Sequence, residues 1–216
     1  MTRKTLGIVL MAAGVALVLG AGCLLIKNHQ EDRNAEAFVQ MVLPEIQREI
    51  VQVQETKPME TVYEPELQLA DYTPVEYLSP EELVMTEKKI NGYDYIGYIC
   101  IPELGLELPV MSDWDYNKLQ VSPCRYSGTL RGEDLVIMAH NYSTHFGRIS
   151  RLTAGSAVVF VDMDGKVWNY QVAAMDVLSG DSVEEMTAGE YDLTLFTCDK
   201  NRSYRVTVRC NRIEEE

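Results

Sequence analysis

Positive charge is scarce in this sequence of 216 residues. Lysine and arginine together number 19, against 33 aspartates and glutamates, which gives a formal net charge of −14. A chain this acidic repels nucleic acids and other anionic polymers, so partners held by electrostatic attraction to such polymers are excluded. The length suits one domain of moderate size with additional segments.

Histidine is scarcer still, and the usual metal-binding motifs are missing. The histidines are His29, His140 and His145, and no two of the five cysteines form a CxxC pair. This spacing matches no zinc site. The acidic stretch 162–164 lacks the further ligands of a calcium loop, and the one at 181–185 suits a solvated loop better. We therefore expect neither a metal nor a cofactor.

Cysteine is present, but its pattern does not require disulfides. Cys23 lies in an apolar N-terminal run, which leaves Cys100, Cys124, Cys198 and Cys210 in the body of the chain. A secreted domain could pair Cys100 with Cys124 or with Cys210, and spacing alone leaves the connectivity open. A chain of this size does not need crosslinks to hold its core, so we expect these three to be small strand or loop residues.

One long uncharged run, LGIVLMAAGVALVLGAGCLLI, extends from Leu6 to Ile26. At about 1.5 Å per residue, a helix of this length spans a hydrocarbon core of about 30 Å. Basic residues precede the run and acidic ones follow Lys27, which predicts a cytoplasmic N-terminus and an extracellular remainder. A cleaved signal peptide would have a shorter apolar core, and a lipoprotein signal would end at Cys23. We therefore expect an uncleaved anchor within residues 1–27.

The composition changes between residues 28 and 90, which we interpret as an acidic extracellular stalk or linker. Apolar residues from Glu31 to Glu55 recur at roughly helical spacing, and Pro44 is expected to kink or split this helix. The second half of the segment is rich in proline and glutamate and has no sustained period, which is typical of an extended spacer. The remaining residues, 91–216, are expected to form one domain.

This domain has the periodicity of short β-strands. We expect strands at Tyr95–Ile101, Leu106–Val110, Leu135–Ala139, Ala157–Val161, Val167–Val177, Asp192–Thr197 and Ser203–Ile213. Asp164-Gly165 is a hairpin signal, and helical structure is expected only at Trp114–Leu119 and as a turn at Arg148–Leu152. Several short strands with turn signals predict an all-β antiparallel sandwich or closed barrel.

Three side chains of the domain have the chemistry of a nucleophilic site. One expected strand ends on Cys198, an earlier one ends on His140, and Arg205 lies on the strand that follows the cysteine. A thiol at a strand end is a nucleophile, a histidine can exchange its proton, and an arginine can stabilise negative charge beside it. A buried structural cysteine is the alternative, and the residue pattern leaves both interpretations open.

The residues around these positions resemble the motifs of the sortases, Gram-positive surface transpeptidases. Thr194-Leu195-Phe196-Thr197-Cys198 is similar to the family's TLxTC signature, Leu135–Tyr142 to its histidine strand, and Tyr204–Val208 carries Arg205 at the expected place. The motifs follow the family's order, and the resemblance covers roughly Tyr93 to Ile213. It implies a closed eight-stranded β-barrel with short helices, preceded by one N-terminal transmembrane helix.

The resemblance also implies an activity. Sortases cleave an LPxTG-like C-terminal sorting signal through a thioacyl-enzyme and transfer the protein to an amine acceptor. Cys198 is then the nucleophile, His140 the proton carrier and Arg205 the stabiliser of the oxyanion or substrate backbone, with support from Thr197. The expected partners are surface proteins with a sorting signal, a peptidoglycan amine and the membrane, but no nucleic acid.

Two other functions use the same residues differently. The first is a cysteine hydrolase of wall peptides with water as acceptor, and the second is a non-catalytic tethered β-domain in which Cys198 is structural. Among sortases, the chain has no C-terminal membrane helix or lid of the pilin-polymerising type. Residues 179–191 are too few for the long helix of the class B enzymes. We therefore expect a single-anchor enzyme that attaches proteins to peptidoglycan, with its subclass left open.

The polar neighbours of these residues are expected to have lesser roles. His145 lies in a polar loop and is interpreted as a surface or loop-packing residue, and Asp199 as a solvated carboxylate at a strand end. Arg202 and Arg209 lie close to Arg205 in sequence. Arg209 shares a strand face with Arg205 but lies farther from the cysteine, so both neighbours are expected to be dispensable for the chemistry.

Overall fold

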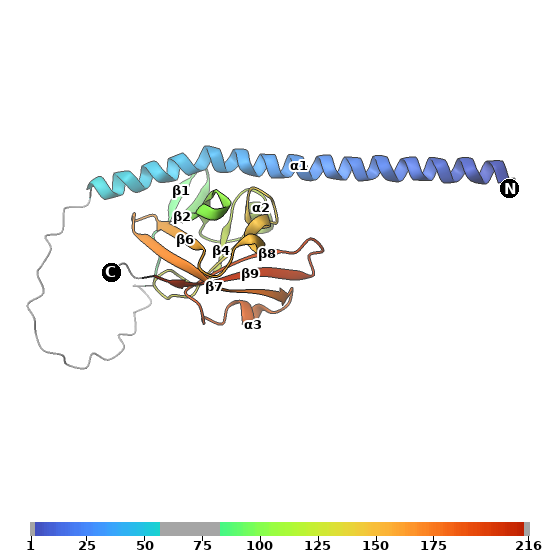
Figure 1. Cartoon of the computed structure of the whole chain (residues 1–216). Helices are drawn as coiled ribbons and strands as arrows, with labels where there is room; N and C mark the ends of the chain where they lie inside the picture. Colours follow the sequence, from blue (N-terminus) through green and yellow to red (C-terminus); the bar gives the residue numbers. More distant parts are fainter. Residues whose placement is uncertain (1–2, 57–82, 214–216) are drawn as a thin grey trace, which may run out of the picture.

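The computed structural model describes residues 3–56 and 83–213, which form one long helix and a β-barrel (Figure 1). The helices are α1 (Arg3–Thr56), α2 (Tyr116–Leu119) and α3 (Val183–Met186), with 3-10 helices η1 (Pro102–Leu104) and η2 (Phe146–Arg151). The strands are β1 (Lys88–Ile90), β2 (Tyr93–Ile101), β3 (Leu106–Met111), β4 (Cys124–Ser127), β5 (Leu135–Met138), β6 (Ala157–Asp162), β7 (Val167–Ser179), β8 (Leu193–Cys198) and β9 (Tyr204–Arg212).

Eight of the strands close into a barrel in the order β2-β3-β4-β5-β8-β9-β7-β6, and β6 pairs with β2 to complete the ring. The short strand β1 pairs with β2 just before the stretch that contacts β6. The neighbours are antiparallel except for β3–β4 and β5–β8, which are parallel. The predicted closed eight-stranded barrel is confirmed, and its contacts are antiparallel apart from these two.

The seven expected strands are all present, with ends that shift by two residues or fewer. The structure adds β1, β4 and α3, which are too short to show a period in the sequence. The expected hairpin joins β6 to β7, and Gly165 adopts a φ of 79° in its turn. The carboxylate of Asp162 accepts backbone N–H groups from Asp164 at 3.0 Å and Lys166 at 2.9 Å, so this acidic stretch is a turn.

The barrel interior is filled by apolar side chains from alternate strand positions. Leu195 of β8 lies opposite Val208 of β9, and both belong to the main core. The intervening residues face outward, where a smaller apolar cluster forms from Val136, Met186 and Phe196. Because side chains alternate along a strand, Phe196 and Cys198 share the outer face of β8.

The second half of α1 packs against the barrel, whereas its first half extends beyond the barrel (Figure 1). Val42 and Ile46 are fully buried, and Val39 and Ile50 nearly so. This spacing forms one face of a helix. The helix continues through Pro44 instead of splitting there, and the buried contacts of the adjacent turns offset the hydrogen bond that proline cannot donate.

The expected stalk therefore contains two different parts. Residues 28–56 are helical, and from Ala35 onward this helix buries side chains against the barrel, so it is not a free spacer. The proline-rich part, residues 57–82, lies outside the described residues. Within the part of the chain that the structure describes, α1 is the one helix long and apolar enough to cross a membrane.

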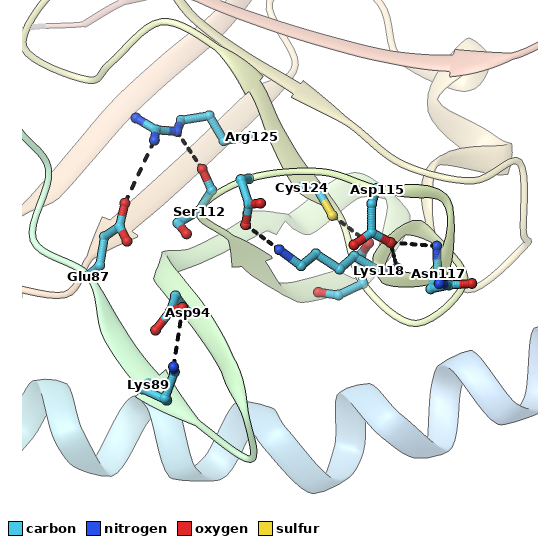
Figure 2. A network of polar contacts seen from close by, with 11 residues as sticks. Glu87, Lys89, Asp94, Ser112, Asp115, Asn117, Lys118, Cys124 and Arg125 are labelled. Atoms are coloured by element: carbon cyan, nitrogen blue, oxygen red, sulfur yellow. Dashed lines mark hydrogen bonds and ion pairs between the residues drawn. The ribbon is translucent and has the colours of Figure 1, made fainter.

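Polar contacts fix the crossover between β3 and β4 (Figure 2). Asp115 caps α2, because its carboxylate accepts backbone N–H groups, including that of Lys118 at 2.9 Å. Arg125 of β4 donates to the carbonyl of Ser112 at 2.7 Å and pairs with Glu87 at 3.7 Å. These contacts hold a connection that returns β4 parallel to β3, which a tight hairpin cannot do.

All five cysteines are free. Cys124 and Cys210 are buried in the barrel, and burial raises the pKa of each thiol to about 12. Cys100 is half-buried, and burial raises its pKa as well. The interpretation of these three as small strand residues is confirmed. No cluster of histidine, cysteine, aspartate and glutamate suited to a metal occurs among residues 3–56 and 83–213.

Candidate active site

Three strand ends meet at one end of the barrel. In the parallel pair β5–β8, Met138 lies opposite Phe196, so His140 and Cys198, each two residues further on, leave adjacent strands at the same level. In the antiparallel pair β8–β9, Cys198 lies directly opposite Arg205. Residues directly opposite each other in an antiparallel pair share one face of the sheet. The register therefore gathers the three candidate residues.

Thr197 fastens the two parallel strand ends together. Its side chain is buried, and its hydroxyl donates to the carbonyl of Ala139 at 2.8 Å. The backbone N–H of Ala139 donates in turn to the carbonyl of Phe196 at 3.2 Å. Because Ala139 precedes His140, these bonds fix the spacing between His140 and Cys198. The Thr197 hydroxyl is engaged away from the outer face, so its contribution is positional.

Cys198 is half-buried and borders a cavity of about 180 Å³. The walls come from the segment after β5, from η2 and from the turn after β8, and include Asn141, Gly147, Ser150 and Asp199. A strand-end thiol held in this way is fixed by the barrel and still reaches open space, as a nucleophile requires.

Asp199 closes the turn between β8 and β9. Its carboxylate accepts the backbone N–H of Tyr204 at 3.0 Å, and its own N–H donates to the carbonyl of Tyr204 at 2.9 Å. The hydrogen bond from Tyr204 holds the pKa of Asp199 below its ordinary value. The sequence suggested a solvated carboxylate, whereas this residue sets the hairpin that pairs Cys198 with Arg205.

Arg205 is half-buried, and its guanidinium folds along the same turn. It donates to the carbonyls of Arg202 and Tyr204, both at 3.2 Å. The guanidinium also lies beside Gly180, where an added Cβ would come within 3.3 Å of Nη1. The missing side chain at Gly180 therefore leaves room for the Arg205 head group.

The imidazole of His140 packs against the ring of Tyr142, with 4.9 Å between the ring centroids. Burial lowers the pKa of His140, the positive charge of Arg202 lowers it further, and Glu31 of α1 acts in the opposite direction. The uncharged imidazole is therefore the dominant form at neutral pH. This is the form that can accept a proton from a thiol.

Residues 141–147, here called the histidine loop, form a compact turn after His140. The carbonyl of Tyr142 accepts the backbone N–H groups of His145 at 3.1 Å and Gly147 at 2.8 Å. A Cβ at Gly147 would lie 2.6 Å from the Tyr142 oxygen, so the turn requires glycine there. Arg148 holds the loop to the barrel through the carbonyls of Ser143 and Leu104, each at 2.9 Å.

His145 is fully buried beneath this loop, so the surface alternative is wrong and the loop-packing one is confirmed. Neither ring nitrogen has a hydrogen-bond partner within the described ranges. The ring lies 5.5 Å from that of Tyr142, measured between centroids. Burial lowers the pKa of His145 to about 4, so the residue packs as a neutral side chain.

Arg202 and Arg209, which lie near Arg205 in sequence, each have a specific interaction. Arg209 is only 6% exposed and donates to the carbonyls of Glu185 at 2.7 Å and Met186 at 3.2 Å, which anchors α3 to the barrel. Arg202 acts on the charge of His140. The expectation that both are dispensable for the chemistry stays a prediction.

One contribution to the site comes from α1 and was missed by sequence reasoning. Asp32 accepts hydrogen bonds from Ser143 and Thr144 of the histidine loop. Asp32 lies 111 residues before Ser143, in the acidic flank of the apolar run, where its sequence context suggests only membrane topology. No local signal links the two segments.

Comparisons with known proteins agree with the barrel fold described above. A family model of the sortase domain matches residues 99–213. Among curated proteins, sortase A of Streptococcus agalactiae serotype III (strain NEM316) is 23% identical over 154 residues, which cover 64% of this chain and 61% of that protein. The chain therefore spans less than two thirds of the length of this relative.

Several solved structures share the fold. Sortase C1 from Streptococcus suis is 25% identical with a TM-score of 0.51, and the match covers 56% of this chain and 74% of that one. Sortase C from Clostridium perfringens SM101 is 18% identical with a TM-score of 0.52 and covers 90% of this chain and 99% of that one. For sortase C1 from Streptococcus agalactiae, the identity is 21%, the TM-score is 0.52 and the coverages are 65% and 79%.

Proposed function

The chain belongs to the sortase family, and we propose that it is a membrane-anchored cysteine transpeptidase that uses Cys198, His140 and Arg205. The main support is the strand register, which sets Cys198 opposite Arg205 and brings His140 to the same level on the adjacent parallel strand. The cavity beside Cys198 and the uncharged state of His140 agree with this chemistry.

In the first step, the sulfur of Cys198 attacks the carbonyl of the scissile Thr–Gly bond in an LPxTG-like sorting signal. Uncharged His140 takes the proton of the thiol and then gives it to the leaving amine, so that a thioacyl-enzyme and a new N-terminus form. Arg205 donates to the oxyanion or the substrate backbone, a contribution typically worth about 3–4 kcal/mol for one donor.

In the second step, an amine acceptor of peptidoglycan attacks the thioester carbonyl. His140 takes the proton of the incoming amine, and the thiol of Cys198 is restored when the C–S bond breaks. Thr197 supports both steps by position, since its bond to Ala139 keeps the two strand ends at a fixed spacing. The product is a surface protein joined to the wall precursor by a new amide bond.

The proposed topology follows from α1. Residues 1–27 form a cytoplasmic tip and a single membrane span, residues 28–90 connect it outside the cell, and residues 91–216 are the extracellular catalytic domain. The support for a span is the length and hydropathy of the first half of α1, together with the basic residues before it and the acidic ones after it.

The activity is tested with the full chain in detergent, because the second half of α1 packs against the barrel. A panel of LPxTG-like peptides is incubated with and without a primary amine, and the products are identified by mass spectrometry. An amide product formed only when the amine is present supports transpeptidation. A free acid alone would indicate a wall-peptide hydrolase, and no turnover of any peptide would indicate a non-catalytic domain.

A further inference from the structure

The helix α1 reaches the histidine loop through one carboxylate. Oδ1 of Asp32 accepts the hydroxyl of Thr144 at 2.6 Å and its backbone N–H at 3.2 Å, and Oδ2 accepts the hydroxyl of Ser143. The backbone carbonyl of Asp32 lies 3.4 Å from the same Thr144 hydroxyl. Two consecutive loop residues thus direct three donors at one side chain.

These contacts are made to an ionised group. Burial raises the pKa of Asp32, but the hydrogen bonds from Ser143 and Thr144 outweigh burial and leave the pKa below its ordinary value. Hydrogen bonds to a carboxylate are shorter and roughly twice as strong as those between neutral groups. Asp32 therefore holds the loop more firmly than a neutral side chain of the same shape would.

Asp32 lies one helical turn before the apolar face that docks α1, on the same side of the helix. That face begins at Ala35 and continues through Val39, Val42 and Ile46, all of them buried against the barrel. The burial of these side chains stabilises the docked helix. The carboxylate extends this face with polar contacts to the loop.

The loop residues that Asp32 holds lead directly to His140. Ser143 follows Tyr142, whose ring packs on the imidazole of His140 with 4.9 Å between centroids and on that of His145 with 5.5 Å. Arg148 fixes the Ser143 carbonyl from the side of η2, and Asp32 fixes the hydroxyl from the side of α1. A loop released from α1 would let Tyr142, and with it His140, move.

We propose that Asp32 is a positioning residue for the reaction at Cys198, acting through Ser143 and Thr144 on His140. This inference rests on the proposed transpeptidase function. It makes the anchoring helix a part of the active site, since the proton carrier takes its working position only while α1 lies against the barrel. The geometric demand is high, because misplacement of a catalytic group by about 1 Å can cost on the order of a hundredfold in rate.

The test compares Asp32→Ala with the wild-type full chain in steady-state kinetics with a sorting-signal peptide and a primary amine. We expect kcat to fall about tenfold or more, with KM for the peptide changed less than twofold, because the transition state loses its proton carrier while the peptide still binds. Asp32→Asn keeps the shape of the side chain and one acceptor, so we expect its kcat to lie between those of the wild type and Asp32→Ala. Glu36→Ala, one helical turn later and exposed, is the matched control and should keep kcat within twofold.

The loop side of the contact gives an independent measurement. The double variant Ser143→Ala/Thr144→Val should show the same loss of kcat, and adding Asp32→Ala to it should change kcat less than twofold further. The double variant by itself carries the test if Asp32→Ala fails to fold.

Unchanged kcat in Asp32→Ala, a loss confined to KM, or fully additive losses would overturn the inference while the wild-type enzyme stays active. A wild-type chain without turnover would overturn the proposed function itself.

Discussion

At the scale of single residues, Cys198 and Cys100 form a natural pair for comparison. Both thiols are half-buried and both stand near the end of a strand, but only Cys198 lies opposite Arg205 and level with His140. Their exposure is similar, so a difference in activity between their variants reports on chemistry more than on burial. The same reasoning applies to the arginines around the site.

We expect Cys198→Ala to abolish formation of the amide product, because no other atom can take the place of the sulfur nucleophile. The change removes little volume, so the free energy of unfolding should fall by at most about 1–2 kcal/mol. Product is measured by mass spectrometry and stability by urea unfolding. Cys100→Ala should keep most of the activity, and an equally inactive Cys100→Ala would show that the wrong thiol was chosen.

Arg205→Lys keeps the positive charge but loses the planar guanidinium and its fixed donors. We expect kcat to fall about a hundredfold with a small change in KM, because the proposed role of Arg205 is to stabilise the oxyanion of the transition state. Steady-state kinetics with a sorting-signal peptide measures both constants. Arg151→Lys, an exposed arginine at the end of η2, is the control and should be fully active. Full activity in Arg205→Lys would remove this residue from the mechanism.

Arg202 and Glu31 should shift the pKa of His140 in opposite directions. Burial lowers that pKa, Arg202 lowers it further and Glu31 raises it. Arg202→Gln should therefore raise the pKa, and Glu31→Gln should lower it. The measurements are NMR titration of the imidazole and the pH dependence of kcat/KM. Shifts of the same sign in the two variants would contradict this electrostatic assignment.

At the scale of elements, α1 and α3 are both held to the barrel by contacts that could not be predicted from their own sequences. The apolar face of α1 was visible as a helical period, but its partner surface was not. The short helix α3 has no period at all, and it is held by carbonyl groups that accept from Arg209. Residues from distant strands therefore hold this element, through Arg209 and through the cluster of Met186 with Val136 and Phe196.

Arg209→Met should therefore destabilise the protein, although it keeps most of the side-chain volume. The variant leaves the buried carbonyls of Glu185 and Met186 without their donor and removes the 3.3 Å ion pair with Asp176. Hydrogen bonds to a charged group are worth about 1.5–3 kcal/mol, so we expect a loss of about 2–3 kcal/mol in urea unfolding. Arg151→Met should stay within about 0.5 kcal/mol of wild type. Equal stability of the two variants would rule out the anchoring role.

At the scale of the whole molecule, buried His145 couples folding to pH. Its pKa is about 4 in the folded chain, against 6.5 for an ordinary histidine. Between these values the unfolded chain binds a proton that the folded chain does not bind, so stability falls as the pH drops from about 6.5 towards 4. The total loss is about 3 kcal/mol. Above pH 7, His145 contributes nothing to the pH dependence of stability.

Urea unfolding at a series of pH values measures this effect. His145→Phe should flatten the dependence between pH 6.5 and 4, because the replacement cannot be protonated in either state. Asp32 adds a further loss of stability at lower pH. Because its pKa is lowered in the folded chain, its contribution to stability is lost only as the carboxylate is protonated. An unchanged slope in His145→Phe would show that another group titrates in this window.

Local sequence patterns determined the elements of this protein and the identity of the candidate site residues. Apolar runs, alternation and turn signals located seven strands, Asp164-Gly165 located a hairpin, and the motifs around His140, Cys198 and Arg205 located the candidate site. Each of these signals lies within a window of a few residues, because backbone preference and strand-face alternation are local properties. The same is true of the apolar run that predicts the anchor.

Only the tertiary structure decided how these elements meet. Closure of β6 on β2, the parallel β5–β8 pair, the docking of α1, the burial of His145 and the hydrogen bonds from Ser143 and Thr144 to Asp32 all join residues far apart in the chain. Such contacts form when complementary surfaces bury enough area to repay the entropy of closing long loops. That balance depends on both partners at once, and neither segment alone contains the information.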